Sequence, residues 1–240
     1  EAYNIDINSN YVIEKVKARD LIVANRLDLI AKIKYVEFKE KGYNMSFVSD
    51  LYKEHIEAFS LGSYKEPGNE NKNSIQKYFA IFNNLIENIK TGGINEELSL
   101  IPVGKNNTIL DGAHRIAIAA YFDMEVPIIR FEHLNVDYDS NFFRRRLLKE
   151  SYIDYLVTEY CKIKKGNIYF ACVWPRAKSE TKRKNIVPLI NRVGGVVYEK
   201  DIEINYCGLK NLITQIYSTQ QWIGNIDNNF RGAKNKVDQC

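Results

Sequence analysis

The stretch Asp111-Gly112-Ala113-His114-Arg115 decides how this sequence is interpreted, because it lies where a β-type pattern changes into a helical one. Before it, Leu98–Val103 and Thr108–Leu110 are two short apolar runs. The four residues 104–107 join them, which predicts two strands in a hairpin-type connection. After it, Ile116–Phe122 is apolar and rich in helix formers. The stretch, called the box from here on, is therefore expected at a strand-to-helix turn.

The chemistry of the box is suited to an anion. Asp111 is a favoured N-cap residue type, and Gly112 allows a ligand or another backbone segment to approach closely. Free N–H groups and the positive end of the dipole meet at a helix start. An acid, an imidazole (His114) and a guanidinium (Arg115) at such a turn predict a site for phosphate chemistry.

The box and its neighbours resemble the ParB/sulfiredoxin superfamily. Ile101-Pro102-Val103 precedes the box, and Val126-Pro127-Ile128-Ile129 follows it like that family's "Val-Pro-hydrophobic" strand. A predicted helix at 75–90, ending at Thr91-Gly92-Gly93, is similar to the helix that precedes the box in the family. The resemblance covers roughly residues 60–132 and implies an α+β fold with a small mixed sheet.

Within the superfamily, the box distinguishes the members. Sulfiredoxins carry a nucleophilic Cys where this chain has Ala113, so the resemblance excludes their chemistry here. The free-serine kinases carry Asp-Gly-x-His/Thr-Arg, which this chain matches, and the resemblance implies a catalytic role for Asp111. Those kinases also use a glutamate before the preceding helix, for which Glu66 is the better positional match and Glu70 the reserve.

These residues predict a phosphotransferase site. Phosphoryl transfer needs alignment and charge neutralisation more than covalent help. Gly112, Ala113, His114 and Arg115 are expected to bind the phosphates of ATP or another nucleotide, and Asp111 or Glu66 to accept the proton of the acceptor hydroxyl. Mg²⁺ is expected with the nucleotide, held by a carboxylate directly or through water. Glu70 and Lys72 are further candidates for contact with metal or substrate, although no residue is assigned as a metal ligand.

Composition sets wider limits. With 240 residues, 45% of them hydrophobic, the chain is long enough for a sizeable core. A net charge of +4 is too small to imply nucleic acid as a partner. No run has the length of a membrane span and no signal-peptide pattern opens the chain, so a cytoplasmic bacterial protein is expected. Four scattered cysteines indicate reduced thiols, and the start at Glu1 suggests a trimmed chain or a piece of a longer one.

Three segments are expected along the chain. Residues 1–60 are predicted to be mainly helical, with helices over 16–41 (stopped by Gly42) and 47–59, the second carrying His55 as a satisfied or surface histidine. Residues 61–132 form the predicted nucleotide-binding domain, and 133–143 is the candidate junction. Residues 144–240 are expected to form an α/β module, with helices over 141–164, 185–193 and 209–217 and strands over 168–174 and 196–204.

Charged and aromatic features outside the box are expected to have structural rather than binding roles. The basic runs 144–146 and 178–184 are expected to be solvated faces, with an anion-binding role as the alternative. Trp222 is expected to be a core anchor rather than a stacking platform.

The leading functional hypothesis is a nucleotide-dependent kinase that phosphorylates a hydroxyl of a small molecule such as an amino acid or a sugar. One alternative is a non-catalytic CTP- or ATP-binding switch. Another is a ParB-like DNA-binding protein or nuclease, which the modest charge and the lack of a helix-turn-helix pattern disfavour. An activity of the C-terminal half, the acceptor and the oligomeric state stay open.

Overall fold

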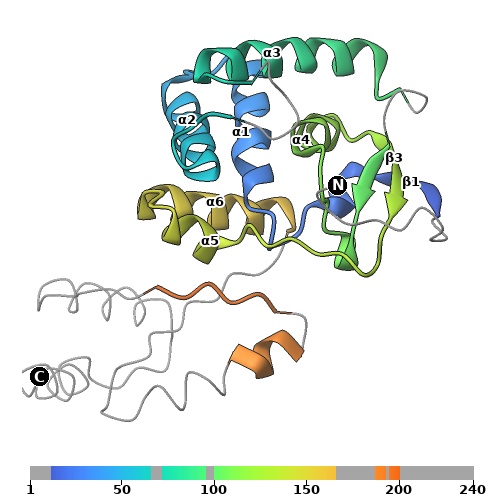
Figure 1. Ribbon diagram of the computed structural model, residues 1–240, viewed down its shortest axis with the longest axis vertical. Helices are drawn as coiled ribbons and strands as arrows, with labels where there is room; N and C mark the ends of the chain where they lie inside the picture. The colour runs from blue at the N-terminus through green and yellow to red at the C-terminus, as the bar shows by residue number, and fades with distance from the viewer. Residues whose placement is uncertain (1–11, 66–71, 96–99, 166–186, 193–194, 201–240) are drawn as a thin grey trace, which may run out of the picture. The chain divides into compact units, whose positions relative to one another are not determined.

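The computed structural model describes residues 12–65, 72–95, 100–165, 187–192 and 195–200. Contacts divide the chain into two compact units, residues 1–196 and 197–240, and only four residues of the second are described. The first unit contains a small sheet and several helices (Figure 1), so the predicted α+β class is confirmed. The predicted boundaries at 60/61 and 132/144 stay predictions.

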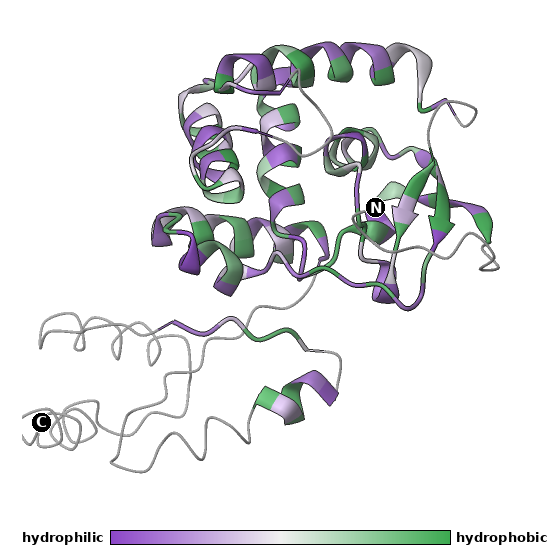
Figure 2. Cartoon of the chain, in the orientation of Figure 1, coloured by the Kyte–Doolittle hydropathy of each residue, from purple (hydrophilic) through white to green (hydrophobic). Residues whose placement is uncertain are grey.

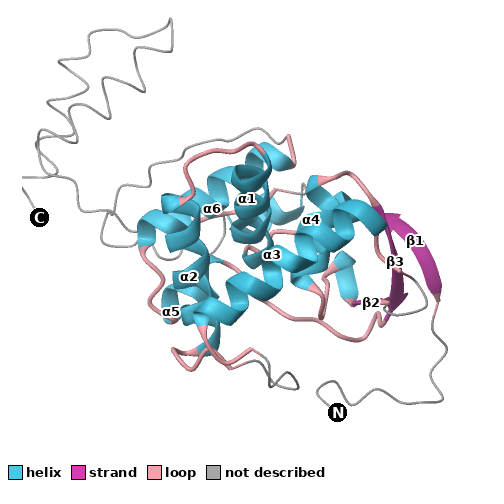
Figure 3. Ribbon diagram, turned by 90° about the horizontal axis from the view of Figure 1, so that it is seen from above, coloured by secondary structure: helices cyan, strands magenta, loops and turns pink. Residues whose placement is uncertain are grey.

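The sheet has three strands, β1 (Ile13–Lys17), β2 (Ile101–Val103) and β3 (Glu125–Arg130), in the order β1-β3-β2. β3 pairs antiparallel with β1, with Val16 opposite Val126, and parallel with β2, with Ile101 opposite Ile128. Figure 3 shows this sheet at one end of the unit, with the helices on one side of it. The central strand β3 carries the predicted segment Val126–Ile129, which is confirmed as a strand.

Helix α4 (Ala113–Tyr121) connects the sheet to the rest of the unit. It follows β2 and precedes the parallel strand β3, so β2, α4 and β3 form a strand–helix–strand unit. Residues 116–120 of α4 are all buried, since the helix packs against α1, α3, η1 and β3. The small side chains of Ala117, Ala119 and Ala120 permit this close packing. The surrounding helices are η1 (Ala18–Leu21, 3-10), α1 (Asp28–Glu40), α2 (Ser46–Ser60), α3 (Ile75–Gly92), η2 (Lys105–Asn107, 3-10), α5 (Ser140–Arg145) and α6 (Glu150–Ile163).

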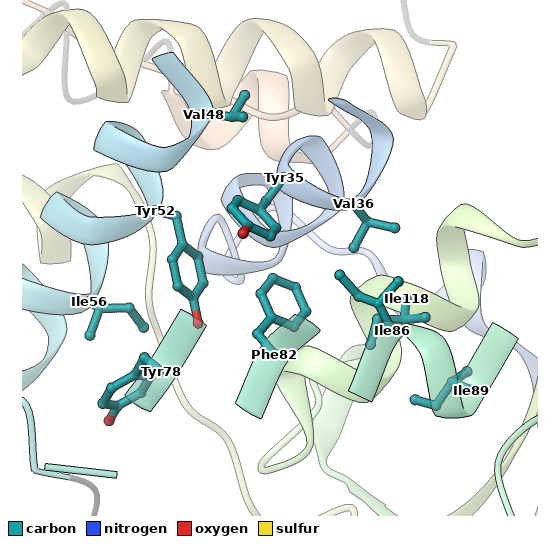
Figure 4. Close-up of a cluster of buried hydrophobic side chains, with 10 residues drawn as sticks. All are labelled: Tyr35, Val36, Val48, Tyr52, Ile56, Tyr78, Phe82, Ile86, Ile89 and Ile118. Atoms are coloured by element: carbon teal, nitrogen blue, oxygen red, sulfur yellow. The ribbon is translucent and has the colours of Figure 1, made fainter. Parts of the chain in front are cut away.

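An aromatic core joins α1, α2, α3 and α4 (Figure 4). The ring of Phe82 stacks on Tyr35 and on Tyr52, with centroid distances of 5.3 and 5.2 Å. Ile86 and Ile118 extend this cluster towards α4. Hydrophobic and hydrophilic residues are mixed along the helices, as expected for helices with one buried face (Figure 2). Among the described residues, no helix is both long and apolar enough to cross a membrane.

Several predicted elements agree with the structure. The helix predicted over 47–59 is α2, and the one predicted over 75–90 is α3, which ends at Gly93 with a φ of +68°. Ser74 caps α3 by accepting a hydrogen bond from the N–H of Lys77. Gly42 follows the end of α1 with a φ of +64°, as its predicted role as a helix stop requires.

The helix predicted over 16–41 is wrong in its first half. Residues 13–17 form β1, and α1 begins only at Asp28, so residues 12–27 contain no α-helix. Pairing with β3 outweighs helix propensity here, because Val16 lies opposite Val126 on the central strand. A local pattern cannot reveal a partner that lies more than a hundred residues away.

The helix predicted over 141–164 is also wrong as a single element. It is interrupted after Arg145, and α6 begins at Glu150. The break lies at Leu147, which has a φ of +63°. A left-handed residue cannot continue an α-helix.

The predicted hairpin before the box is confirmed only in part. β2 begins at Ile101, and 108–110 is not a strand, although Ile109 forms an isolated antiparallel bridge with Val103. Residues 187–192 are helical within the helix predicted over 185–193, whereas 196–200 have no regular structure where a strand over 196–204 was predicted. The predicted segments 168–174, 178–184 and 209–217, and Trp222, lie outside the described residues.

Candidate functional site

The box lies in the turn between the Ile109 bridge and α4. Gly112, rather than Asp111, is the N-cap of α4, and Asp111 does not cap the helix, so the predicted capping role is wrong. Gly112 has a φ of +82°, a conformation that glycine adopts without strain. A Cβ at this position would lie 2.8 Å from Cδ1 of Ile101 and 2.9 Å from Nη2 of Arg115. The glycine therefore lets the guanidinium of Arg115 lie directly against the backbone of the turn.

Arg115 and Asp111 form a loose ion pair. Nη2 of Arg115 lies 3.7 Å from Oδ2 of Asp111, and their side chains are 22% and 69% exposed. Within the described residues, the guanidinium makes no hydrogen bond. Burial lowers the pKa of Arg115 and the Asp111 carboxylate partly opposes this shift. A mostly buried guanidinium with unfilled donors, beside a helix N-terminus, is suited to binding a phosphate.

His114 is held from α2. Its Nε2 lies 2.8 Å from the hydroxyl of Tyr52, and its ring packs edge-on against Phe82 at 4.7 Å. The pKa of His114 is well below its ordinary value, first because burial disfavours the charged ring and second because Lys32 and Lys72 are close. His114 is therefore neutral at neutral pH.

Behind the box, two cations share one carboxylate. Nε and Nη2 of Arg26 lie 2.8 and 2.9 Å from the two carboxylate oxygens of Asp28, and Nζ of Lys32 lies 2.9 Å from Oδ2. All three side chains are at most 4% exposed. Although burial alone would raise the pKa of Asp28, Arg26 and Lys32 hold it far below its ordinary value.

His55 extends this cluster towards Tyr52. Its Nδ1 lies 2.8 Å from the carbonyl oxygen of Tyr52, and its Nε2 lies 3.1 Å from Nζ of Lys32. The carbonyl accepts from Nδ1–H, so Nε2 is left to accept from the ammonium. Burial and Lys32 lower the pKa of His55 to about 3, so the ring is neutral. The expectation of a satisfied histidine is confirmed, with the ring fully buried.

These contacts connect both ends of the box to one network. Nη1 of Arg26 donates to the carbonyl oxygen of Ile109, just before the box, and Tyr52 meets His114 at its far end. We call the continuous set that runs from Arg26 through Asp28, Lys32, His55 and Tyr52 to His114 the polar ring. Four of its members, Arg26, Asp28, Lys32 and Tyr52, were not identified from the sequence. The charged pair Asp28 and Lys32, four residues apart among Leu29, Ile30 and Ile33, was the available signal.

The other predicted site residues have mixed outcomes. Lys72 lies near the box, since its charge contributes to the lowered pKa of both His114 and Lys32, and its Nζ is 5.4 Å from the centre of the Tyr78 ring. Glu66 and Glu70 lie outside the described residues. Within the described part of the chain, no three His, Cys, Asp or Glu side chains gather as a metal site would require. Asp111 is an exposed carboxylate 3.7 Å from Arg115.

The basic run 144–146 has structural contacts. Nε of Arg144 lies 2.7 Å from Glu150, and Nη1 of Arg146 donates to the carbonyl of Phe59 at 2.7 Å while its guanidinium covers the ring of Phe142. These two side chains join α5 to α6 and to α2, so they do not form a free anion-binding face.

Comparison with known proteins adds no assignment. A scan against protein-family models, a search of curated proteins and a search of solved structures each gave no match. The functional argument therefore depends on the geometry of the box and the polar ring.

Proposed function

We propose that this chain is a nucleotide-dependent kinase that phosphorylates a hydroxyl of a small molecule, with the box as its phosphate site. The observation that carries the proposal is Arg115, whose side chain is 22% exposed and whose guanidinium has no hydrogen bond among the described residues. A cation that is largely removed from water and pairs only loosely with Asp111 gains from a ligand that accepts hydrogen bonds from it. Phosphate oxygens match the planar fork of arginine.

The turn supplies further donors. The backbone N–H groups from Gly112 to His114 belong to the cap and first turn of α4 and have no partner within the helix. The dipole of α4 adds positive potential at the same point. The order β2, box, α4, β3, with β2 parallel to β3, supports the resemblance to the ParB/sulfiredoxin fold on which the choice of kinase depends.

Asp111 is the proposed general base. Its carboxylate is 69% exposed, so an acceptor hydroxyl has access to it, and Arg115 lies 3.7 Å away. In this role, Asp111 accepts the hydroxyl proton while the box neutralises charge on the transferring phosphoryl group. Mg²⁺ and ATP, or another nucleotide, complete the proposal, with the cation carried by the nucleotide phosphates and a carboxylate.

A binding switch is the second candidate. The polar ring favours it, because Arg26 and Tyr52 connect both ends of the box to α1 and α2. A ligand at the box would change the balance of charge in this ring and thereby affect two helices. Only the kinase consumes the nucleotide, so a measurement of nucleotide consumption distinguishes the two candidate functions.

The decisive experiment is ³¹P NMR of the protein with ATP, ADP or CTP, Mg²⁺ and pooled amino acids and sugars. A new phosphomonoester signal that is lost in Asp111→Asn supports the kinase proposal, with Asp123→Asn as the control, since this exposed aspartate lies after the other end of α4. If Asp111→Asn turned over substrate at the wild-type rate, the assignment of Asp111 as the general base would be refuted. Broadened nucleotide signals without product would favour the switch.

Arg115→Ala tests binding itself. Loss of its charged hydrogen bonds to phosphate should weaken nucleotide binding by about 1.5–3 kcal/mol. Arg145→Ala, at an exposed arginine of α5, is the matched control and should leave binding unchanged. Equal nucleotide affinity in Arg115→Ala and Arg145→Ala would show that Arg115 does not bind the phosphates, which would contradict the proposal.

A further inference from the structure

Two consecutive residues before α1 hold the segment that leads into the box. Nδ2 of Asn25 donates to Oγ1 of Thr108 at 3.0 Å, and Nη1 of Arg26 donates to the carbonyl oxygen of Ile109. Thr108 and Arg26 are both buried, with exposed fractions of 0% and 2%. We call Asn25 and Arg26 the clamp, because together they bind two consecutive residues of a segment that is distant in the sequence.

The clamp is itself fixed by two other segments. Nε and Nη2 of Arg26 donate to the carboxylate of Asp28 at the start of α1. The N–H of Tyr138 donates to the carbonyl oxygen of Asn25 at 2.7 Å, and the N–H of Leu27 donates to that of Tyr138 at 3.2 Å. The Arg26 guanidinium also lies 5.0 Å from the centre of the Tyr138 ring. A guanidinium engaged in this way is suited to fixing a backbone carbonyl rather than to binding a ligand.

The side chain of Asp111 is only loosely held, so its direction depends on the backbone. It is 69% exposed and makes no hydrogen bond within the described residues, and its ion pair with Arg115 is 3.7 Å long. On one side of Asp111, Gly112 is fixed as the N-cap of α4. On the other side, Ile109 is fixed by an isolated bridge to β2 and by Arg26. The clamp therefore sets one of the two anchors between which Asp111 lies.

We propose that the clamp directs the carboxylate of Asp111 for proton transfer, so that Asn25 and Arg26 are positioning residues of the reaction. The inference rests on the proposed function for the role of Asp111 as the base. Release of the Ile109 carbonyl lets the backbone before Asp111 turn, and a displacement of about 1 Å can lower a rate about a hundredfold. Within the described residues, the clamp has no contact with Arg115, so the rate should fall more than the nucleotide affinity.

The test is steady-state kinetics of the full chain carrying Arg26→Lys, with the acceptor that ³¹P NMR identifies. Lysine keeps the charge but has no planar fork, so it cannot make all three hydrogen bonds of the arginine. We expect kcat to fall about tenfold to a hundredfold, while KM for the nucleotide stays unchanged. Arg146→Lys is the matched control, because Arg146 likewise donates to a backbone carbonyl, that of Phe59, and covers the ring of Phe142. It should leave kcat unchanged.

Thr108→Val is a milder variant, which keeps the proposal testable if Arg26→Lys does not fold. Valine has a similar shape and removes the contact with Asn25, which keeps its hydrogen bond to the carbonyl oxygen of Val136 at 3.0 Å. The fall in kcat should have the same direction and be smaller. Thr158→Val removes a hydroxyl that is hydrogen-bonded within α6, so it is the matched control.

NMR of the free protein separates positioning from activity. The backbone amide signals of residues 110–112 should shift in Arg26→Lys and Thr108→Val and stay in place in the two controls. If these signals shift while kcat stays at the wild-type value, the positioning role is refuted and the proposed function stands. An equal fall of kcat in Arg146→Lys would attribute the effect to lost stability and would also refute the role. If the wild-type chain forms no phosphorylated product, the proposed function fails and the positioning role fails with it.

Discussion

Arg26 and Asp28, two residues apart in the sequence, form a buried two-point ion pair with distances of 2.8 and 2.9 Å. The geometry matches both carboxylate oxygens to two guanidinium nitrogens. Arg26 also donates to the carbonyl of Ile109, so this pair joins the beginning of α1 to the segment that leads into the box. The position of the box therefore depends on residues more than eighty positions earlier in the chain.

Asp28→Asn should reduce the free energy of unfolding by about 3 kcal/mol. The substitution keeps the shape of the side chain but leaves Arg26 and Lys32 without their shared counter-charge. The loss stays at the lower end of the range for broken buried pairs, since burial already lowers the pKa of Lys32 and removal of the Asp28 carboxylate lowers it further, which reduces the cost of losing the charge. Urea unfolding measures the change. Asp50→Asn, at an exposed position of α2, should change stability by less than about 0.5 kcal/mol, and an equal loss in both variants would contradict the prediction.

The sequence predicted those helices and strands that are specified by nearby residues, through apolar periodicity and end signals. Helices α2 and α3 have strong apolar periodicity and clear ends at Ser74, Gly93 and the turn after Ser60, and β3 follows from Val126–Ile129. β1 was missed because its identity as a strand comes from pairing with β3. The break at Leu147 was missed because leucine carries no signal for a left-handed conformation.

The same division applies to the candidate site. Asp111, Gly112, His114 and Arg115 are adjacent in the sequence, so their types and spacing made them visible. The polar ring was not predicted, because Arg26 and Tyr52 reach the segment around the box only through tertiary packing, in which α1 packs against α4 and α2 packs against α1. In the sequence alone, nothing distinguishes these residues from ordinary charged or aromatic residues.

Gly112→Ala should cost more stability than Gly42→Ala, although both glycines have positive φ angles of +82° and +64°. At Gly42, no atom lies within 4 Å of the place that a Cβ would occupy, so its substitution tests backbone strain alone, about 1 kcal/mol. At Gly112 the new carbon also meets Ile101 and Arg115. The excess loss should be at least about 1 kcal/mol, measured by urea unfolding. Equal losses of unfolding free energy in the two variants would mean that Arg115 moves away from the new carbon without cost. Sulfate binding at the box would then report the displacement of Arg115.

Tyr52→Phe should remove the hydrogen bond to His114 and keep the aromatic packing. The hydroxyl lies 2.8 Å from Nε2, while the ring stacks on Phe82 with an interplanar angle of 23°. We expect a loss of about 1 kcal/mol in the free energy of unfolding and a change in the ¹⁵N shift of His114 Nε2. Tyr43→Phe, at an exposed tyrosine after α1, is the control for removal of a phenol hydroxyl. An unchanged His114 signal in Tyr52→Phe would show that this contact does not form in solution.

Stability should fall as the pH drops below about 6.5, the ordinary pKa of histidine. The folded chain holds His55 neutral with a pKa of about 3, and the pKa of His114 is also well below its ordinary value. The unfolded chain therefore binds protons that the folded chain excludes. The stability due to neutral His55 is fully present above the unfolded pKa and declines below it, by about 2 kcal/mol between pH 7 and pH 5. His114 adds a loss in the same direction.

Urea unfolding at several pH values measures this slope, and variants assign it. His133→Asn, at an exposed position, is the matched control. His55→Gln should reduce the slope whatever it does to absolute stability, since glutamine does not titrate. The stabilisation by Asp28 adds a further loss below about pH 4, because the unfolded chain takes up a proton on this carboxyl group there, whereas the folded chain, in which its pKa is far lower, does not. A flat profile between pH 7 and pH 5 would mean that His55 is not buried neutral, and the polar ring would lose its central link.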